Sequence, residues 1–78
     1  MNRQEIFEQV AEVIAERLGC DPEGIHMDTR FQDLKMDSLD TVALIMELED
    51  RIEKEVDVDF EKGIKTVEDV VNFVEKSL

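Results

Sequence analysis

The chain has 78 residues, of which 21 are acidic and nine are basic, so its formal net charge at pH 7 is −12. This length allows one domain, residues 1–78, with no room for a substrate cleft beside a separate catalytic apparatus. The charge argues against nucleic acid and anionic membranes as partners and favours proteins with basic docking patches. The single cysteine, Cys20, excludes an internal disulfide, and no apolar stretch approaches a membrane span. The sequence predicts a cytoplasmic monomer.

The apolar residues, 42% of the chain, recur periodically, which predicts a folded domain rather than a disordered acidic chain. A first helix is expected from about Arg3 to Leu18. Asn2 supplies its N-cap, Glu5 completes a capping box, and Gly19 ends the helix. The apolar face of this helix is expected to contain Ile6, Phe7, Val10, Val13, Ile14 and Leu18.

A long loop without sustained periodicity follows over residues 19–37. It holds the only proline, Pro22, after which one helical turn is expected. Long loops are unusual in so small a domain. Four apolar residues are expected to pin this one across the open side of a helical bundle: Ile25, Met27, Phe31 and Leu34.

The second helix is expected to begin with Asp37 as N-cap, with Asp40 as its reciprocal partner, and to continue to about Glu53. Its apolar residues exceed what one buried stripe requires, so part of them is expected to face a partner. They are Leu39, Val42, Ile45, Met46, Leu48 and Ile52.

A short helix is expected near residues 57–62, and a last helix from the N-cap Thr66, with Asp69 as reciprocal partner, to about Ser77. The apolar face of the last helix is Val67, Val70, Val71, Phe73 and Val74. The predicted fold is all-α: a small, irregular, antiparallel bundle of three main helices and one short helix, with a long loop between helices 1 and 2.

No residue set predicts catalysis, so the chain is not expected to be an enzyme. The one histidine, His26, has no second histidine and no nucleophile near it in sequence. One calcium-binding pattern is present, with acids at positions one, three, five and twelve of an EF-hand-like loop: Asp57, Asp59, Glu61 and Glu68. However, the sixth position, which requires glycine, is Lys62, and this argues against a true EF-hand.

Ser38 is the most informative residue, because it stands between the long loop and the second helix. An Asp-Ser pair is often no more than a helix start. A hydroxyl at a helix N-terminus is also well placed to carry a phosphate ester, since unpaired backbone N–H groups and the helix dipole favour negative charge there. The long loop before Ser38 and the lack of other chemistry in the chain favour an attachment site.

At these residues the chain resembles the acyl carrier proteins, and the resemblance covers nearly its whole length. It rests on an acidic first helix, a long loop, and three runs: Asp37-Ser38-Leu39-Asp40-Thr41-Val42, Leu44-Ile45-Met46-Glu47-Leu48-Glu49, and Lys65-Thr66-Val67 before a last helix that contains Phe73.

The resemblance implies a non-catalytic carrier for fatty acid synthesis. A phosphopantetheinyl transferase would use coenzyme A and Mg²⁺ to join 4′-phosphopantetheine to Ser38, with Asp37 taking part in recognition. The thiol of the arm would carry acyl groups as thioesters to synthesis enzymes with basic docking patches. The implied docking surface is Leu39, Asp40, Val42, Met46, Glu49 and Asp50. The implied acyl-chain pocket, for which core packing is the competing role, is Phe31, Val42, Ile45, Met46, Leu48, Ile64 and Phe73.

Two departures from the family pattern keep alternatives open. Lys35 and Met36 stand where family members usually have glycine and a small or apolar residue. Ala43 and Arg51 stand where fatty-acid carriers often have acids. The alternatives are a specialised polyketide or lipid-pathway carrier, a non-modified acidic interaction adaptor, and a divalent-cation sensor that uses the region from Asp57 to Glu68.

Overall fold

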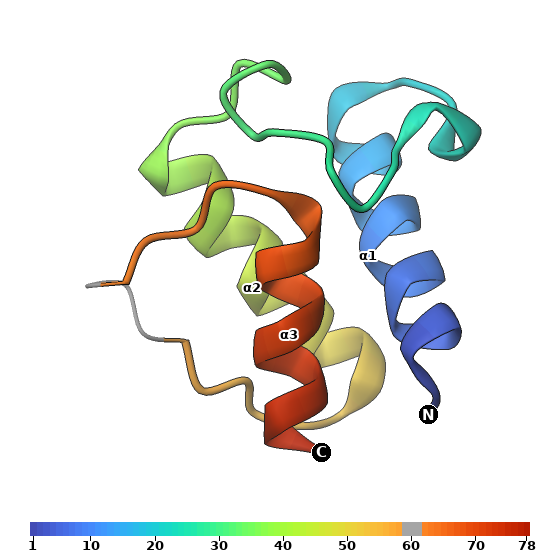
Figure 1. The fold of residues 1–78 in the computed structure, drawn as a ribbon, viewed down its shortest axis with the longest axis vertical. Coiled ribbons are helices and arrows are strands. Elements are labelled where there is room, and N and C mark those ends of the chain that lie inside the picture. Colours follow the sequence, from blue (N-terminus) through green and yellow to red (C-terminus); the bar gives the residue numbers. More distant parts are fainter. Residues whose placement is uncertain (59–61) are drawn as a thin grey trace.

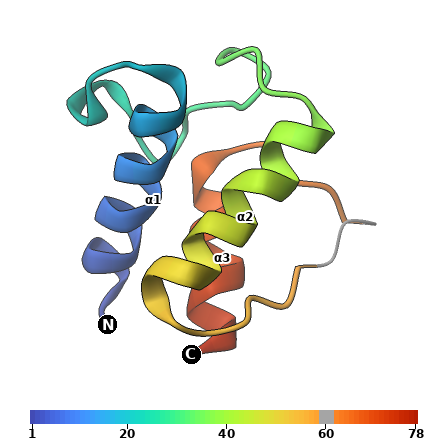
Figure 2. The same ribbon diagram turned by 180° about the vertical axis from the view of Figure 1, so that it is seen from behind.

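Three main helices and one short helical turn make up the computed structural model, which describes residues 1–58 and 62–78. In chain order they are α1 (Arg3–Leu18), the 3₁₀ turn η1 (Pro22–Gly24), α2 (Ser38–Ile52) and α3 (Val67–Ser77). Both α2 and α3 run in the opposite direction to α1 (Figures 1 and 2). The all-helical fold predicted from the sequence is confirmed, including the helical turn after Pro22.

All three main helices begin with the capping boxes that the sequence predicts. In each, the N-cap side chain accepts a hydrogen bond from the backbone N–H three residues on, and the acidic residue there accepts one from the N-cap backbone. These bonds satisfy N–H groups that have no partner inside the helix, which fixes where each helix starts. The pairs are Asn2 with Glu5, Asp37 with Asp40, and Thr66 with Asp69.

The core lies between the three helices and under the long loop. Each fully buried valine, leucine or isoleucine contributes about 1.5–3 kcal/mol by leaving water. The apolar faces predicted for the helices supply most of it. Phe7 and Phe73 are half-buried against the cluster, and Leu18 is 40% exposed, because it lies in the last turn before the chain leaves α1 at Gly19. The buried cluster is Ile6, Val10, Ala11, Val13, Ile14, Ile25, Phe31, Met36, Leu44, Ile45, Leu48, Val56, Val67, Val70, Val71 and Val74.

The long loop is fastened to the segment before α3, an arrangement that the sequence pattern does not reveal. The Phe31 N–H donates to the Lys65 carbonyl at 3.0 Å, and the Val67 N–H donates to the Thr29 carbonyl at 3.0 Å. Between these bonds, Arg30 and Thr66 form an isolated antiparallel bridge. As a result, the loop crosses near the N-terminal ends of α2 and α3 (Figure 1).

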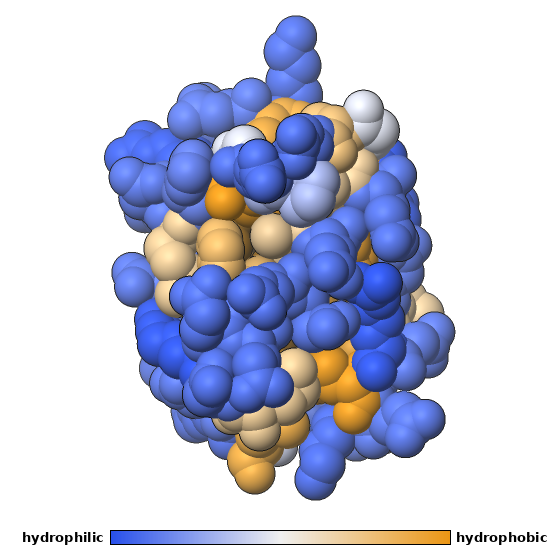
Figure 3. Space-filling model, turned by 90° about the vertical axis from the view of Figure 1, so that its right-hand side faces the viewer, coloured by the Kyte–Doolittle hydropathy of each residue, from blue (hydrophilic) through white to orange (hydrophobic). Residues whose placement is uncertain are grey.

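The short helix expected over residues 57–62 involves residues 59–61, which lie outside the described residues. Asp57 and Val58, at its expected start, are irregular. On the α1 side of the molecule, hydrophilic side chains cover most of the surface and apolar ones show in separate patches (Figure 3). Over residues 1–58 and 62–78, none of the helices has the length and apolar character needed to cross a membrane.

Candidate functional site

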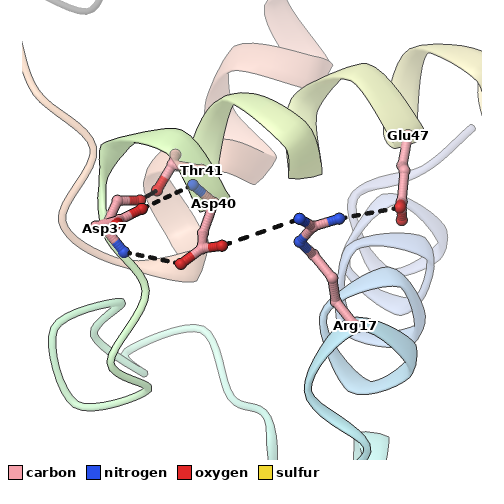
Figure 4. Close-up of polar contacts among 5 residues, drawn as sticks. All are labelled: Arg17, Asp37, Asp40, Thr41 and Glu47. Atoms are coloured by element: carbon pink, nitrogen blue, oxygen red, sulfur yellow. Dashed lines mark hydrogen bonds and ion pairs between the residues drawn. The ribbon is translucent and has the colours of Figure 1, made fainter.

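Ser38 is the first residue of α2, and its side chain is exposed. The cap of the helix depends on its neighbours instead. Asp37 Oδ1 accepts a hydrogen bond from the Asp40 N–H at 2.9 Å, and Asp40 Oδ2 accepts one from the Asp37 N–H at 3.3 Å. Thr41 Oγ1 donates to the Asp37 carbonyl at 3.0 Å (Figure 4). The Ser38 hydroxyl is therefore left at the surface with no part in the capping box.

The backbone turn that leads into Ser38 requires a left-handed residue. Lys35 has φ +58°, a conformation that favours glycine and costs other residues about 1–2 kcal/mol. The next residue, Met36, is buried and its N–H donates to the Phe31 carbonyl at 3.0 Å. Met36 thus anchors the turn in the core. The sequence Lys35-Met36 forms this turn without the glycine that the family pattern leads one to expect, at the expense of local strain.

An open hollow of about 1020 Å³ lies against Ser38. It is bounded by the turn before α2, the first turn of α2, and the segment before α3. This volume is slightly above the range found for small-molecule sites, about 300–1,000 Å³, because the hollow is open to solvent. The residues that line it are Arg30, Phe31, Gln32, Lys35, Met36, Asp37, Ser38, Thr41, Val42, Gly63, Ile64, Lys65 and Thr66.

The candidate acyl-chain residues divide between this hollow and the closed core. Phe31, Val42 and Ile64 line the hollow. Ile45 and Leu48 are buried in the core, while Phe73 is half-buried against it and Met46 is exposed. The hollow is therefore lined by only part of the predicted set, and the acyl-binding role of every member stays a prediction.

The outward face of α2 carries an apolar patch. Leu39 is 79% exposed, Met46 60% and Val42 39%, so the surplus apolar residues predicted for this helix do face solvent. Ser38 lies at one end of the helix that presents them. Exposed apolar side chains concentrated on one helix are typical of a protein-binding surface.

The acids predicted for docking differ in their contacts. Asp50 is exposed. Glu49 is half-buried, and its Oε2 accepts a hydrogen bond from the Val56 N–H at 3.0 Å, which holds the chain where it leaves α2. Asp40 serves in the capping box and also lies 3.9 Å, Oδ1 to Nη2, from Arg17 of α1. Hence Asp50 is the member of the three whose carboxylate has no structural contact among the described residues.

Two arginines join α1 to α2 in a way that sequence analysis missed. Arg17 Nη1 lies 3.2 Å from Glu47 Oε1, so with its contact to Asp40 it bridges the first turn of α2 and a residue past the middle of that helix (Figure 4). Arg51, which departs from the acidic family pattern, lies 3.1 Å from Glu12. Nothing in the sequence indicates these partners, because each contact joins residues more than 20 positions apart.

The calcium-binding pattern is not assembled in the described part of the chain. Asp59 and Glu61 lie outside the described residues. Glu68 Oε2 lies 3.2 Å from Arg3 Nη2, so its carboxylate is engaged with α1. In the part of the chain that the structure describes, no group of three or more His, Cys, Asp or Glu side chains is arranged to hold a metal ion.

Comparison with known proteins agrees with the all-helical fold. A family model described as "Phosphopantetheine attachment site" matches residues 8–74. The chain is 42% identical over 71 residues to an acyl carrier protein of Streptococcus thermophilus (strain CNRZ 1066), covering 91% of this chain and 93% of that protein. It is 44% identical over 73 residues to an acyl carrier protein of Campylobacter curvus (strain 525.92), covering 91% and 94% of the two chains.

A third relative, an acyl carrier protein of Thermosynechococcus vestitus (strain NIES-2133 / IAM M-273 / BP-1), is 41% identical over 75 residues, covering 95% of this chain and 93% of that protein. The fold and the matched domain define a small helical protein built to hold a phosphopantetheine group. The chain belongs to the acyl carrier protein family, and the resemblance found in the sequence is confirmed.

Proposed function

We propose that this protein carries acyl groups of fatty acid synthesis as thioesters on a 4′-phosphopantetheine arm attached to Ser38. The position of the Ser38 hydroxyl is the main support for this proposal. The hydroxyl lies exposed at the start of α2, outside the capping box, at the edge of an open hollow. A modification there leaves every hydrogen bond of the cap in place.

The attachment is a phosphoryl transfer for which Ser38 supplies the nucleophile. Its Oγ forms a bond to the phosphorus nearest the pantetheine in coenzyme A, the pyrophosphate bridge breaks, and adenosine 3′,5′-bisphosphate leaves. The serine proton passes to a base of the transferase or to water. The carboxylate of Asp37, directly beside Ser38 and exposed, supports a role in holding the transferase or its Mg²⁺.

The arm supplies a thiol, and partner enzymes supply the catalysis. We propose that these partners dock on the outward face of α2 through the apolar side chains of Leu39, Val42 and Met46 and the acid Asp50. Their basic patches would be drawn to a chain of net charge −12. Cys20 is free and pairs with no second cysteine, which supports the reducing cytoplasm as the site of this work.

Intact mass measurement tests the attachment. The parent protein and Ser38→Ala are incubated with coenzyme A, Mg²⁺ and a broad-specificity phosphopantetheinyl transferase. The parent is expected to gain one phosphopantetheine and the variant none. Circular dichroism should show the same fold in both, because Asp37 remains the cap. Absence of a mass gain in the parent would contradict the proposal and favour the unmodified adaptor.

Charge reversal tests the docking surface. Asp50→Lys is expected to slow association with an acyl-transfer enzyme about tenfold at low salt and much less at high salt. Glu8→Lys on the exposed face of α1 is the matched control, since it changes the net charge equally. Equal effects of the two variants would show that net charge, and not the α2 surface, governs docking.

A further inference from the structure

Basic side chains gather at the hollow beside Ser38, in a chain with more than twice as many acids as bases. Three of the nine lysines and arginines line it: Arg30, Lys35 and Lys65. Among the described residues that line the hollow, Asp37 is the only acid. As far as the structure describes its lining, the hollow therefore holds more positive than negative side chains, on a strongly negative protein.

These three residues come from separate parts of the chain and meet through tertiary contacts. Arg30 belongs to the long loop and forms the bridge with Thr66, while the Lys65 carbonyl accepts the hydrogen bond from the Phe31 N–H. Lys35 is held by the left-handed turn before α2. The fold thus brings three like charges to one hollow, although their mutual repulsion opposes this arrangement.

The other arginines of the protein are placed differently. Arg3, Arg17 and Arg51 each lie within 4.0 Å of two carboxylates. Among ion pairs formed by residues 1–58 and 62–78, none includes Arg30, Lys35 or Lys65. None of these three cations is therefore held in an ion pair by a described acid, which leaves their N–H donors available to an anionic group.

We propose that this hollow is a subsite for the phosphodiester at the base of the arm, with Arg30, Lys35 and Lys65 as its cationic contacts. The inference rests on the proposed attachment to Ser38. A phosphodiester keeps one negative charge, and its phosphorus would be bonded directly to the oxygen of a residue that lines the hollow. Lysine and arginine form charge-assisted hydrogen bonds with phosphate oxygens. The covalent link also keeps the group at the site without a separate binding step.

Two consequences follow for the loaded protein. Addition of the arm changes the formal net charge from −12 to −13, which by itself increases self-repulsion and lowers the melting temperature. The cations of the hollow offset that repulsion where the new charge is placed. They also restrain the base of the arm, so that the attached arm extends from Ser38 toward the hollow.

The test compares the change in melting temperature on loading, holo minus apo, in three proteins. They are the parent, Lys35→Gln/Lys65→Gln, and the control Lys54→Gln/Lys76→Gln. Both double variants remove two exposed positive charges. The control residues lie at the C-terminal ends of α2 and α3, and a 15-residue helix of about 22 Å separates Ser38 from Lys54, more than two Debye lengths at 0.1 M salt. Because each protein is compared with its own apo form, its intrinsic stability cancels.

The change on loading is expected to be about 4 °C less favourable in Lys35→Gln/Lys65→Gln than in the parent, and the same as the parent in the control. At 0.5 M salt the difference between the variants should fall to about 1 °C. Equal changes in all three proteins at low salt would overturn the subsite. Intact mass separates this result from failure of the proposed function, because there the parent gains no phosphopantetheine and the subsite falls with it.

A second comparison separates the phosphodiester from a charged cargo. The arm is loaded with a succinyl group, which ends in a carboxylate, or with a butyryl group, which has no charge. If the cations bind the phosphodiester, Lys35→Gln/Lys65→Gln should make the change in melting temperature on loading less favourable by the same amount with both groups. An effect that appears only with the succinyl group would overturn the assignment. It would mean that the three cations bind the carboxylate of the carried group and not the phosphodiester.

Discussion

The two sides of α2 differ in whether their charged residues form ion pairs. On the edge that faces α1, Arg17 spans Asp40 and Glu47, so positive and negative groups are matched. On the edge that faces the hollow, Lys35 and Lys65 have no acidic partner among the described residues. Both sides belong to one chain with 21 acids and nine bases, so the overall composition does not explain the difference. Tertiary placement, rather than composition, therefore decides where charge is available for a ligand.

The largest expected effect on stability comes from a substitution in the core, on the buried side of α2. Leu44 is completely buried, and Leu44→Ala should lower the free energy of unfolding by about 2–5 kcal/mol, because it leaves a cavity under α2. Leu39→Ala, at a residue 79% exposed on the same helix, should change it by less than about 0.5 kcal/mol. Urea denaturation measures both. Similar losses in the two variants would show that the outward face of α2 is part of the core.

The next effect concerns the start of the helix, where the two edges meet. Asp37→Ala removes the acceptor for the Asp40 N–H and should destabilise the protein by about 1 kcal/mol. Ser38→Ala, one residue later, should have almost no effect, since the serine is outside the capping box. Thermal unfolding of the two apo variants checks this contrast. A cap supplied by Ser38 would reverse their order.

A smaller and opposite effect is expected on the edge that faces the hollow. Lys35→Gly should stabilise the apo protein by about 0.5–1 kcal/mol, because relief of left-handed strain exceeds the entropy that glycine loses on folding. Lys35→Gln retains the strain and serves as the control. The melting temperatures of both are compared with the parent. A less stable glycine variant would mean that the lysine side chain contributes more than its backbone strain costs.

The smallest effects on stability concern the ion pairs with α1. Arg17→Gln and Arg51→Gln each remove exposed contacts and should cost about 0.2–1 kcal/mol. Their effects on docking should differ. Loss of Arg17 frees Asp40 and Glu47 of α2, so a basic partner should associate faster at low salt, whereas loss of Arg51 frees Glu12 and Glu16 of α1. Stopped-flow association rates distinguish the two variants. Identical rates would show that the freed acids of α2 and those of α1 contribute equally to docking.

The helices of this protein were predictable from sequence because their signals are local. Asn2, Asp37 and Thr66 each have an acid three residues later, and this spacing is sufficient to place a helix start without knowledge of the fold. The same spacing places Ser38 at the first position of α2, and its role as the attachment site stays a prediction. Leu18 was placed on the apolar face of the first helix by its spacing, yet it is 40% exposed, because periodicity does not show that the last turn of a helix extends beyond the core.

Only the tertiary structure decided which charges meet and which remain available. The bonds from Phe31 to Lys65 and from Val67 to Thr29 join segments more than 30 residues apart, and no sequence periodicity encodes such a pairing. They place Arg30 and Lys65 at one hollow with Ser38. The sequence by itself determined the helices, the exposed serine and the family, because capping and apolar spacing act over a few residues. The charged surroundings of that serine depend on the packing of distant segments, and only the folded chain reveals them.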